Sequence, residues 1–203
     1  MCMKIVLAIL FALIVPMSLF QIVYHIPFFY TTTDFSPQEK QFYVDEFTKY
    51  LDGRQQLSQQ TIAQMSEEEI IHMQDVARLF FIVRVVNIIL LIITILLLTQ
   101  KNIRKELTPA TKYASIGIFA FLIISGIVFK PFFLFFHKLI FTNNYWFLPL
   151  ESLLIRLFPQ STFFLIYTVT LLSSSLILFI IHYKLKHHET YSTKTKNNKR
   201  NAL

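Results

Sequence analysis

The sequence has almost no cysteine, and this scarcity removes several classes of protein. Cys2 is the single cysteine among 203 residues, so the chain cannot form an internal disulfide bond. No group of cysteines and histidines has the spacing of a zinc site. The first apolar run lacks the small-residue cleavage site of a signal peptide and continues past Pro16. We therefore expect a retained membrane anchor at the start of the chain, and no metal.

Long apolar runs, in contrast, are abundant. Hydrophobic residues make up 54% of the chain, and four runs approach the length of about 20 residues that spans roughly 30 Å of hydrocarbon. This pattern excludes a soluble domain. We expect membrane spans at residues 5–24, 79–98, 113–129 and 161–181. The prediction is an all-α integral membrane protein with a four-helix transmembrane domain at residues 1–185 and a basic, disordered tail at residues 186–203.

The segments that connect these spans differ in charge. Residues 25–78 carry four Lys or Arg against nine Asp or Glu, and residues 130–160 carry three Lys or Arg. Residues 99–112 carry four basic side chains in a short loop, and residues 182–203 carry six. The positive-inside rule then places both termini in the cytoplasm and the loops 25–78 and 130–160 outside. The net charge of +7 is a topology signal, so we expect no nucleic-acid partner.

The first outer loop contains two helix-start patterns. Ser36 is followed by Pro37 and by Glu39 three positions on, and Ser66 is followed by Glu69. In such a capping box the serine and the third helical residue satisfy each other's free backbone amides. We therefore expect the outer loops to be helical and to form a cap on the transmembrane helices.

His72 lies on the helix that Ser66 begins. Glu68 and Asp75, at i−4 and i+3, can each reach its ring. A carboxylate on one imidazole nitrogen fixes the tautomer and raises the basicity of the other nitrogen. This pattern predicts that His72 is a general base, oriented by Asp75 or Glu68. The alternative interpretation is a surface histidine in an acidic, solvated turn.

His137 lies in the aromatic second outer loop, with Phe133 and Phe141 at i±4. It is either an anchor at the level of the lipid headgroups or a site residue that acts as an oxyanion stabiliser or general acid. Two side chains that titrate near neutral pH at a lipid–water boundary suit acid–base chemistry on lipid. For Arg84, near the outer end of the second span, the alternative to substrate binding is snorkelling to the interface. The predicted substrate-binding residues are Arg78, Arg84, Asn143 and Trp146.

The residues around the two histidines resemble the bacterial lipoprotein intramolecular transacylase family. The first pattern is Glu-x-x-His-Met-x-Asp-Val at residues 69–76, ahead of the second span. The second is Phe-His-x-x-x-Phe-x-Asn-x-x-Trp at residues 136–146, ahead of the fourth span. The resemblance extends to the four spans, the acidic first outer loop and the aromatic second outer loop.

This resemblance implies a specific activity in the cell membrane of a Gram-positive bacterium. Such an enzyme moves the sn-2 acyl chain of a diacylglyceryl lipoprotein onto the α-amine of the lipoprotein's own N-terminal cysteine. The product is an N-acyl, S-monoacylglyceryl lyso-form lipoprotein. The family's two essential histidines fall on His72 and His137. The expected partners are the diacylated lipoprotein and the bilayer, and no cofactor is expected.

We also expect no covalent acyl-enzyme. The outer loops lack an obvious nucleophile, because Ser66 and Ser161 are better interpreted as helix caps. Two alternatives to a transacylase stay open. One is a non-catalytic sensor or accessory subunit that binds a partner through its acidic loop. The other is a b-type cytochrome with His72 and His137 as axial ligands, which is disfavoured because haem ligands in helical bundles usually lie within spans.

Overall fold

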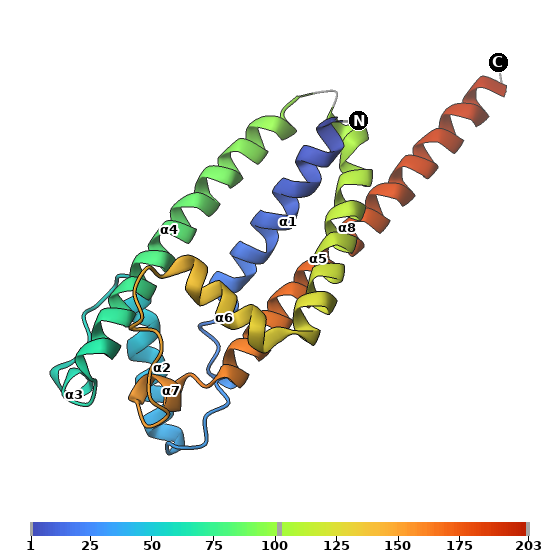
Figure 1. Ribbon diagram of the computed structural model, residues 1–203. Helices are drawn as coiled ribbons and strands as arrows, with labels where there is room; N and C mark the ends of the chain where they lie inside the picture. Colours follow the sequence, from blue (N-terminus) through green and yellow to red (C-terminus); the bar gives the residue numbers. More distant parts are fainter. Residues whose placement is uncertain (1, 101–102, 202–203) are drawn as a thin grey trace.

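The computed structural model describes residues 2–100 and 103–201. The elements, in chain order, are α1 (Cys2–Val23), η1 (Pro27–Phe29), α2 (Pro37–Leu51), α3 (Gln59–Ile62), α4 (Glu67–Leu98), α5 (Arg104–Ile127), α6 (Phe129–Ile140), α7 (Leu153–Leu157) and α8 (Gln160–Asn201). No β-strand occurs among the described residues, and the predicted all-α class is confirmed (Figure 1). Lys101 of the basic segment and residues 202–203 of the expected tail lie outside the described residues.

Four helices are long and apolar enough to cross a membrane. Their candidate spans are Met3–Val23, Glu67–Leu98, Lys105–Ile127 and Gln160–Tyr191. Each overlaps one expected span, but the helices differ from the apolar runs at their ends. α4 begins well before residue 79, and α5 begins before residue 113 and ends before residue 129. The reason is that caps and backbone geometry determine where a helix ends, whereas hydropathy marks only its apolar part.

Helices α1, α5 and α8 form the core of the bundle. Ala110 and Ala114 of α5 and Leu178 of α8 are almost completely buried there. Small residues allow helices to approach closely in a membrane, and hydroxyl groups can then bond across the interface. Ser115 Oγ donates to the carbonyl of Ser175 at 2.9 Å, and Ser175 Oγ donates to the carbonyl of Ser115 at 3.0 Å. This reciprocal pair joins α5 to α8.

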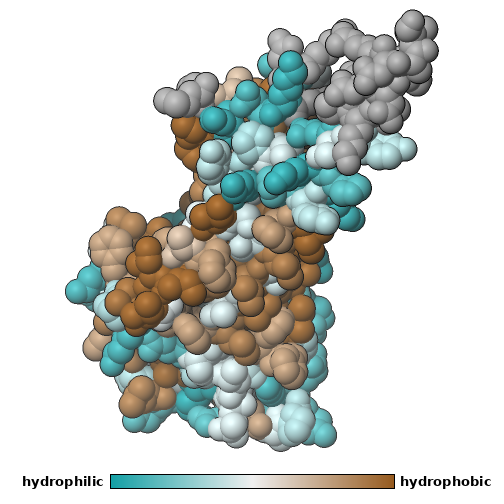
Figure 2. Space-filling model, turned by 90° about the vertical axis from the view of Figure 1, so that its right-hand side faces the viewer, coloured by the Kyte–Doolittle hydropathy of each residue, from teal (hydrophilic) through white to brown (hydrophobic). Residues whose placement is uncertain are grey.

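Helix α4 lies at the edge of the bundle and packs chiefly against α1 and α2. Asn87 Nδ2 donates to Ser18 Oγ at 3.0 Å and so ties α4 to α1. Other faces of α4 expose large apolar side chains, among them Phe81, Ile88 and Leu96. Figure 2 shows hydrophobic residues gathered in the middle of the molecule, between hydrophilic ends. This distribution matches a protein whose middle faces lipid.

At one end of the bundle, α2, α3 and α7 pack around the first turns of α4, and we refer to α2, α3, α7 and their connecting segments as the cap (Figure 1). Both predicted capping boxes are present, with Ser36 and Glu39 at the start of α2 and Ser66 and Glu69 at the start of α4. Phe47 of α2 is completely buried in the apolar centre of the cap. The helical cap predicted from the sequence is therefore formed.

A buried carboxylate fixes the cap to α4. The side chain of Glu69 is 2% exposed, and its two oxygens accept hydrogen bonds from the amides of Ser66 at 2.8 Å and Leu154 at 2.9 Å. The second bond joins the start of α7 to the start of α4. Because both oxygens have donors, the burial of this charge is compensated.

The tail differs from the expected disordered segment, because α8 continues through Asn201. The chain contains no glycine or proline between Gln160 and Asn201, so nothing in this stretch interrupts a helix that the span has already begun. Just beyond the span, His182 Nδ1 bonds to the carbonyl of Thr108 at 2.8 Å, which fixes α8 to α5.

Candidate active site

The structure brings His72 and His137 together. Their ring centroids are 6.3 Å apart, with an interplanar angle of 37°. His72 is on the second turn of α4, in the portion 67–78 that precedes the apolar run, and His137 is near the end of α6. Both rings are half-buried. The two histidines that the sequence singled out are therefore neighbours, at the junction of the cap and the bundle.

The course of α6 explains how these distant residues meet. Helix α5 ends at Ile127, and the backbone turns at Val128, which has φ −111° and ψ 35°. Helix α6 then runs across the end of the bundle from α5 towards α4 (Figure 1). This path carries His137, in the last turn of α6, to the side of α4 that bears His72.

Aromatic side chains surround both histidines. The ring centroid of His137 is 4.2 Å from that of Phe133 and 5.4 Å from that of Trp146. Phe141 packs against both histidines, at 5.0 Å from His72 and 5.6 Å from His137. A porphyrin plane between the two imidazoles would collide with this phenyl ring, so the geometry does not support a haem site.

The contacts of His137 determine its tautomer. Its Nδ1 lies 2.8 Å from the carbonyl oxygen of Phe133. A carbonyl oxygen can only accept a hydrogen bond, so Nδ1 carries the proton and donates. In the neutral ring, Nε2 then has a free lone pair and can accept a proton from a substrate.

His72 is held differently. Its Nδ1 is buried and has no hydrogen-bond partner among the described residues. Asp75 influences His72 electrostatically, but the Asp75 carboxylate is bonded elsewhere: its Oδ2 accepts from Asn143 Nδ2 at 2.8 Å. Glu68, the other expected orienting residue, is exposed at the start of α4. The structure thus gives neither carboxylate a hydrogen bond to His72, and one oxygen of Asp75 is instead bonded to Asn143, which is distant in sequence.

Burial favours the neutral form of both imidazoles. It lowers the pKa of His137, against the opposing effect of the hydrogen bond to the Phe133 carbonyl. Burial and the neighbouring His137 lower the pKa of His72, and Asp75 acts in the opposite direction. Two neutral imidazoles side by side offer lone pairs and N–H donors, which are the groups needed for proton transfer and for stabilising a developing oxyanion.

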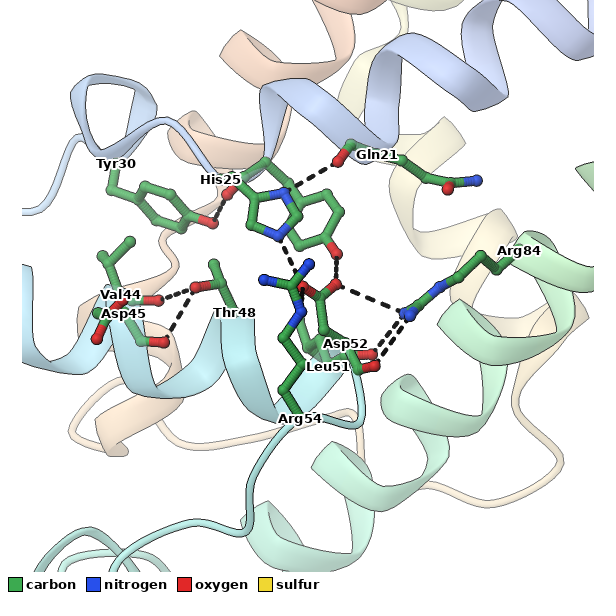
Figure 3. Close-up of polar contacts among 11 residues, drawn as sticks. Gln21, His25, Tyr30, Val44, Asp45, Thr48, Leu51, Asp52, Arg54 and Arg84 are labelled. Atoms are coloured by element: carbon green, nitrogen blue, oxygen red, sulfur yellow. Dashed lines mark hydrogen bonds and ion pairs between the residues drawn. The ribbon is translucent and has the colours of Figure 1, made fainter.

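Of the predicted substrate-binding residues, the structure places Asn143 and Trp146 beside the histidines and Arg84 elsewhere. Arg84 Nη1 and Nη2 each lie 2.9 Å from a carbonyl oxygen, that of Asp52 and that of Leu51 respectively, at the end of α2 (Figure 3). Arg84 therefore caps α2 and fixes it to α4. Arg78 is exposed on α4. Contacts of any of these four residues with substrate stay predictions.

A polar cluster around Asp52 was not anticipated from the sequence. The Asp52 carboxylate is 6% exposed and accepts hydrogen bonds from Tyr24 and from His25, the latter at 3.0 Å, while Arg54 Nε lies 3.1 Å away (Figure 3). Although burial raises the pKa of Asp52, the bonds from Tyr24 and His25 lower it overall. In the sequence, Arg84 was the signal for this cluster, because a charged side chain near a membrane span requires a partner.

No group of three or more His, Cys, Asp or Glu side chains that could hold a metal ion occurs in the part of the chain that the structure describes. The fold and the site together define a multi-pass membrane protein with a pair of neighbouring histidines at the junction of a helical cap and the bundle.

Comparisons with known proteins agree with this class. A family model described as "Lipoprotein intramolecular transacylase Lit" matches residues 1–164. The chain therefore belongs to the lipoprotein intramolecular transacylase family, whose members are acyltransferases. No curated protein matches the chain.

Solved structures with the same fold come from the membrane-integral lipoprotein intramolecular transacylase Lit of Bacillus cereus. One is 20% identical with a TM-score of 0.74, covering 93% of this chain and 96% of that chain. Variants of that protein with a histidine replaced by arginine or by alanine have TM-scores of 0.61, also at 20% identity. The first variant is matched over 94% of this chain and 95% of its own, the second over 93% and 96%.

Proposed function

We propose that this protein moves the sn-2 acyl chain of a diacylglyceryl lipoprotein onto the α-amine of that lipoprotein's N-terminal cysteine. The observation that carries the proposal is the pairing of His72 with His137, at 6.3 Å, at the cap–bundle junction of a chain of the transacylase family. The product is an N-acyl, S-monoacylglyceryl lyso-form lipoprotein. The substrate is a lipoprotein of a Gram-positive cell membrane, and the site lies at the outer leaflet.

The reaction is an ester aminolysis that needs one base and one oxyanion donor. The neutral amine attacks the sn-2 carbonyl carbon, and a tetrahedral intermediate with a negatively charged oxygen forms. The amine proton passes to the base, the bond between the carbonyl carbon and the glyceryl oxygen breaks, and the base returns the proton to that oxygen. An amide and a free hydroxyl result, and no oxidant or metal takes part.

The contacts support His137 as the base and His72 as the donor, the reverse of the sequence-based expectation. That expectation depended on a carboxylate bonded to His72, but Asp75 bonds to Asn143. His137 instead has the fixed partner, because the Phe133 carbonyl holds its Nδ1–H and leaves Nε2 free to accept a proton. A neutral His72 retains one N–H for the oxyanion.

A direct transfer, without a covalent acyl-enzyme, is part of the proposal. Within the described part of the chain, Ser66 caps α4, and Ser161 Oγ bonds to Thr31 Oγ1 at 2.7 Å. Neither serine has a histidine base beside it, as an activated hydroxyl nucleophile requires. Donor ester and acceptor amine belong to one molecule, so positioning replaces a second substrate site and supplies a high effective concentration.

Replacement of each histidine by glutamine and by alanine tests the proposal. Glutamine can donate a hydrogen bond but cannot act as a base. We therefore expect His137→Gln and His137→Ala to lose similar activity, roughly 10²–10⁴-fold for a general base. His72→Gln should retain more activity than His72→Ala, because an oxyanion donor contributes roughly 10²–10³-fold.

The measurement is mass spectrometry of lipoprotein N-terminal peptides from cells that otherwise make only the diacyl form. Membrane levels of each variant, compared by immunoblotting, are the control for expression. Near wild-type conversion by both alanine variants would contradict the proposed site. If instead His72→Gln is as inactive as His72→Ala, while His137→Gln retains more activity than His137→Ala, the two roles are exchanged.

A further inference from the structure

The side chain of Asn143 connects the two elements that carry the histidines. Its Nδ2 donates to Asp75 Oδ2 at 2.8 Å. Asp75 lies one turn beyond His72 on α4, and Asn143 lies just after α6, which carries His137. A single hydrogen bond thus joins the segments that bear the two catalytic candidates.

The rest of the fold provides little else to hold these segments together. Helix α4 packs chiefly against α1 and α2, and α6 follows α5. Ring contacts also join the two segments at the site, namely those of His72 with Phe141 and with His137. Ring contacts tolerate sliding, whereas a hydrogen bond to a carboxylate fixes a distance and a direction.

The other end of the same carboxamide organises the loop after α6. Asn143 Oδ1 accepts from the amide of Tyr145 at 3.1 Å, which is an Asx-type turn. The next residue is Trp146, whose ring lies 5.4 Å from that of His137. The Asn143 amide group therefore donates to Asp75 on α4, and its oxygen accepts from the turn that places Trp146 against His137.

We propose that Asp75 and Asn143 form a clasp, and that both are positioning residues that set the separation of His72 and His137. The inference depends on the proposed function, since it assigns how the same site is held in its working geometry. The clasp acts through the bond between the two side chains. An acceptor on one side and a donor on the other are required, and it does not matter which side carries the charge.

An exchange of the two side chains tests the clasp. Asn143→Asp places two carboxylates against each other at pH 8 and should lower kcat roughly ten- to hundredfold, the range for a lost hydrogen bond to a charged group. Asp75→Asn keeps an acceptor oxygen, so its loss of kcat should be several-fold smaller than the loss caused by Asn143→Asp. The double variant Asp75→Asn with Asn143→Asp restores an amide donor opposite a carboxylate. In that variant a carboxylate at position 143 can still accept from the Tyr145 amide, so we expect kcat to recover to within about threefold of wild type.

Asn144→Asp is the matched control, because it introduces the same charge at the adjacent, exposed position and should leave kcat near wild type. The assay follows N-acylation of a purified diacyl lipopeptide by the full-length protein in lipid nanodiscs, with kcat, KM and thermal unfolding temperature recorded. We expect the loss and its recovery in kcat, with similar unfolding temperatures. A purely structural role would instead move the unfolding temperature together with activity.

Failure of the exchange to restore kcat, or an Asp75→Asn variant as inactive as Asn143→Asp, would overturn the clasp. The second result would indicate that the charge of Asp75 acts directly on His72. Both outcomes are distinct from failure of the proposed function, in which the wild-type protein forms no N-acyl product or the His72→Ala and His137→Ala variants remain active.

Discussion

At the scale of single residues, the proposed chemistry depends on two histidines whose neutral form is favoured by burial. His137 has its tautomer fixed by a backbone carbonyl 2.8 Å from Nδ1, and His72 is packed against Phe141. The environment lowers the pKa of both rings. Each imidazole therefore loses its lone pair to a proton only as the pH falls below the ordinary value of about 6.5.

This predicts how the rate depends on pH. The substrate amine must be neutral to attack, and a free α-amine has a pKa of about 7.7–8.0. As the pH rises, kcat/KM should increase through the pKa of the amine. Protonation of the histidines should lower kcat/KM further only below about pH 6.5. Initial rates between pH 5 and 9 would show this, and a lipopeptide with a less basic amine should shift the profile by the difference in amine pKa. If the rise of kcat/KM above pH 6.5 occurred at the same pH with the less basic lipopeptide, it would not come from the amine, and the prediction that both histidines are neutral in this range would be wrong.

The sequence predicted the histidine pair but not its partners. His72 and His137 could be singled out because each lies in a distinctive local pattern. The orientation of Asp75 could not be predicted, because i, i+3 spacing shows which side chains can reach each other within a helix. It does not show a competing donor such as Asn143, which tertiary folding brings to the same carboxylate. The partner of His137 is a backbone carbonyl, which no side-chain pattern reveals.

At the scale of helices, α4 links the transmembrane bundle to the cap. Its start was predictable from the capping box of Ser66 and Glu69, which is a local signal. Its contact with the end of α2 was not, because Arg84 and Asp52 meet only in the folded protein. Arg84 caps the last carbonyls of α2, and Asp52 joins the same cluster to Tyr24 and His25 at the end of α1 (Figure 3).

We therefore predict that Arg84→Leu destabilises the protein. The change removes two hydrogen bonds to carbonyls and a cation 3.6 Å from the Asp52 carboxylate. The expected loss is about 1–3 kcal/mol of unfolding free energy, seen as a lower thermal unfolding temperature in nanodiscs. The control is Arg78→Leu, which replaces an exposed arginine on the same helix and should have little effect on stability. If Arg84→Leu left stability intact but raised KM, Arg84 would instead be a substrate-binding residue.

At the scale of the whole molecule, the hydrophobic middle of the surface and the cap at one end suit a protein that works at one face of a bilayer (Figure 2). The four spans were predictable because apolar length is a strong signal. The continuation of α8 to Asn201 was not, because basic, polar composition indicates solvation and does not by itself distinguish a helix from a disordered tail. Helix α1 begins at the end of the bundle opposite the cap, and α8 extends away from the cap beyond it (Figure 1).

This arrangement and the charge of the loops predict the topology. We expect the cap, His72 and His137 outside the cell and both ends of the chain in the cytoplasm. Reporter fusions after Gln55 and after Asn144 should be active only outside, and a fusion after Gln100 only inside. An Asn144 fusion that is active in the cytoplasm would separate the two histidines across the membrane and contradict the topology.

The central claim is that the acyl chain moves within one lipoprotein molecule, and a label-crossover measurement tests it most directly. Purified protein in nanodiscs receives equal amounts of two diacyl lipopeptides, one with heavy acyl chains and a light peptide, the other with light acyl chains and a heavy peptide, together with excess unlabelled phospholipid. We predict that the N-acyl group always carries the label of its own molecule, because the amine and the sn-2 ester enter the site together. Heavy chains on the amine of the heavy peptide, or light chains on the amine of the light peptide, whether from the other lipopeptide or from phospholipid, would show transfer between molecules and contradict the account.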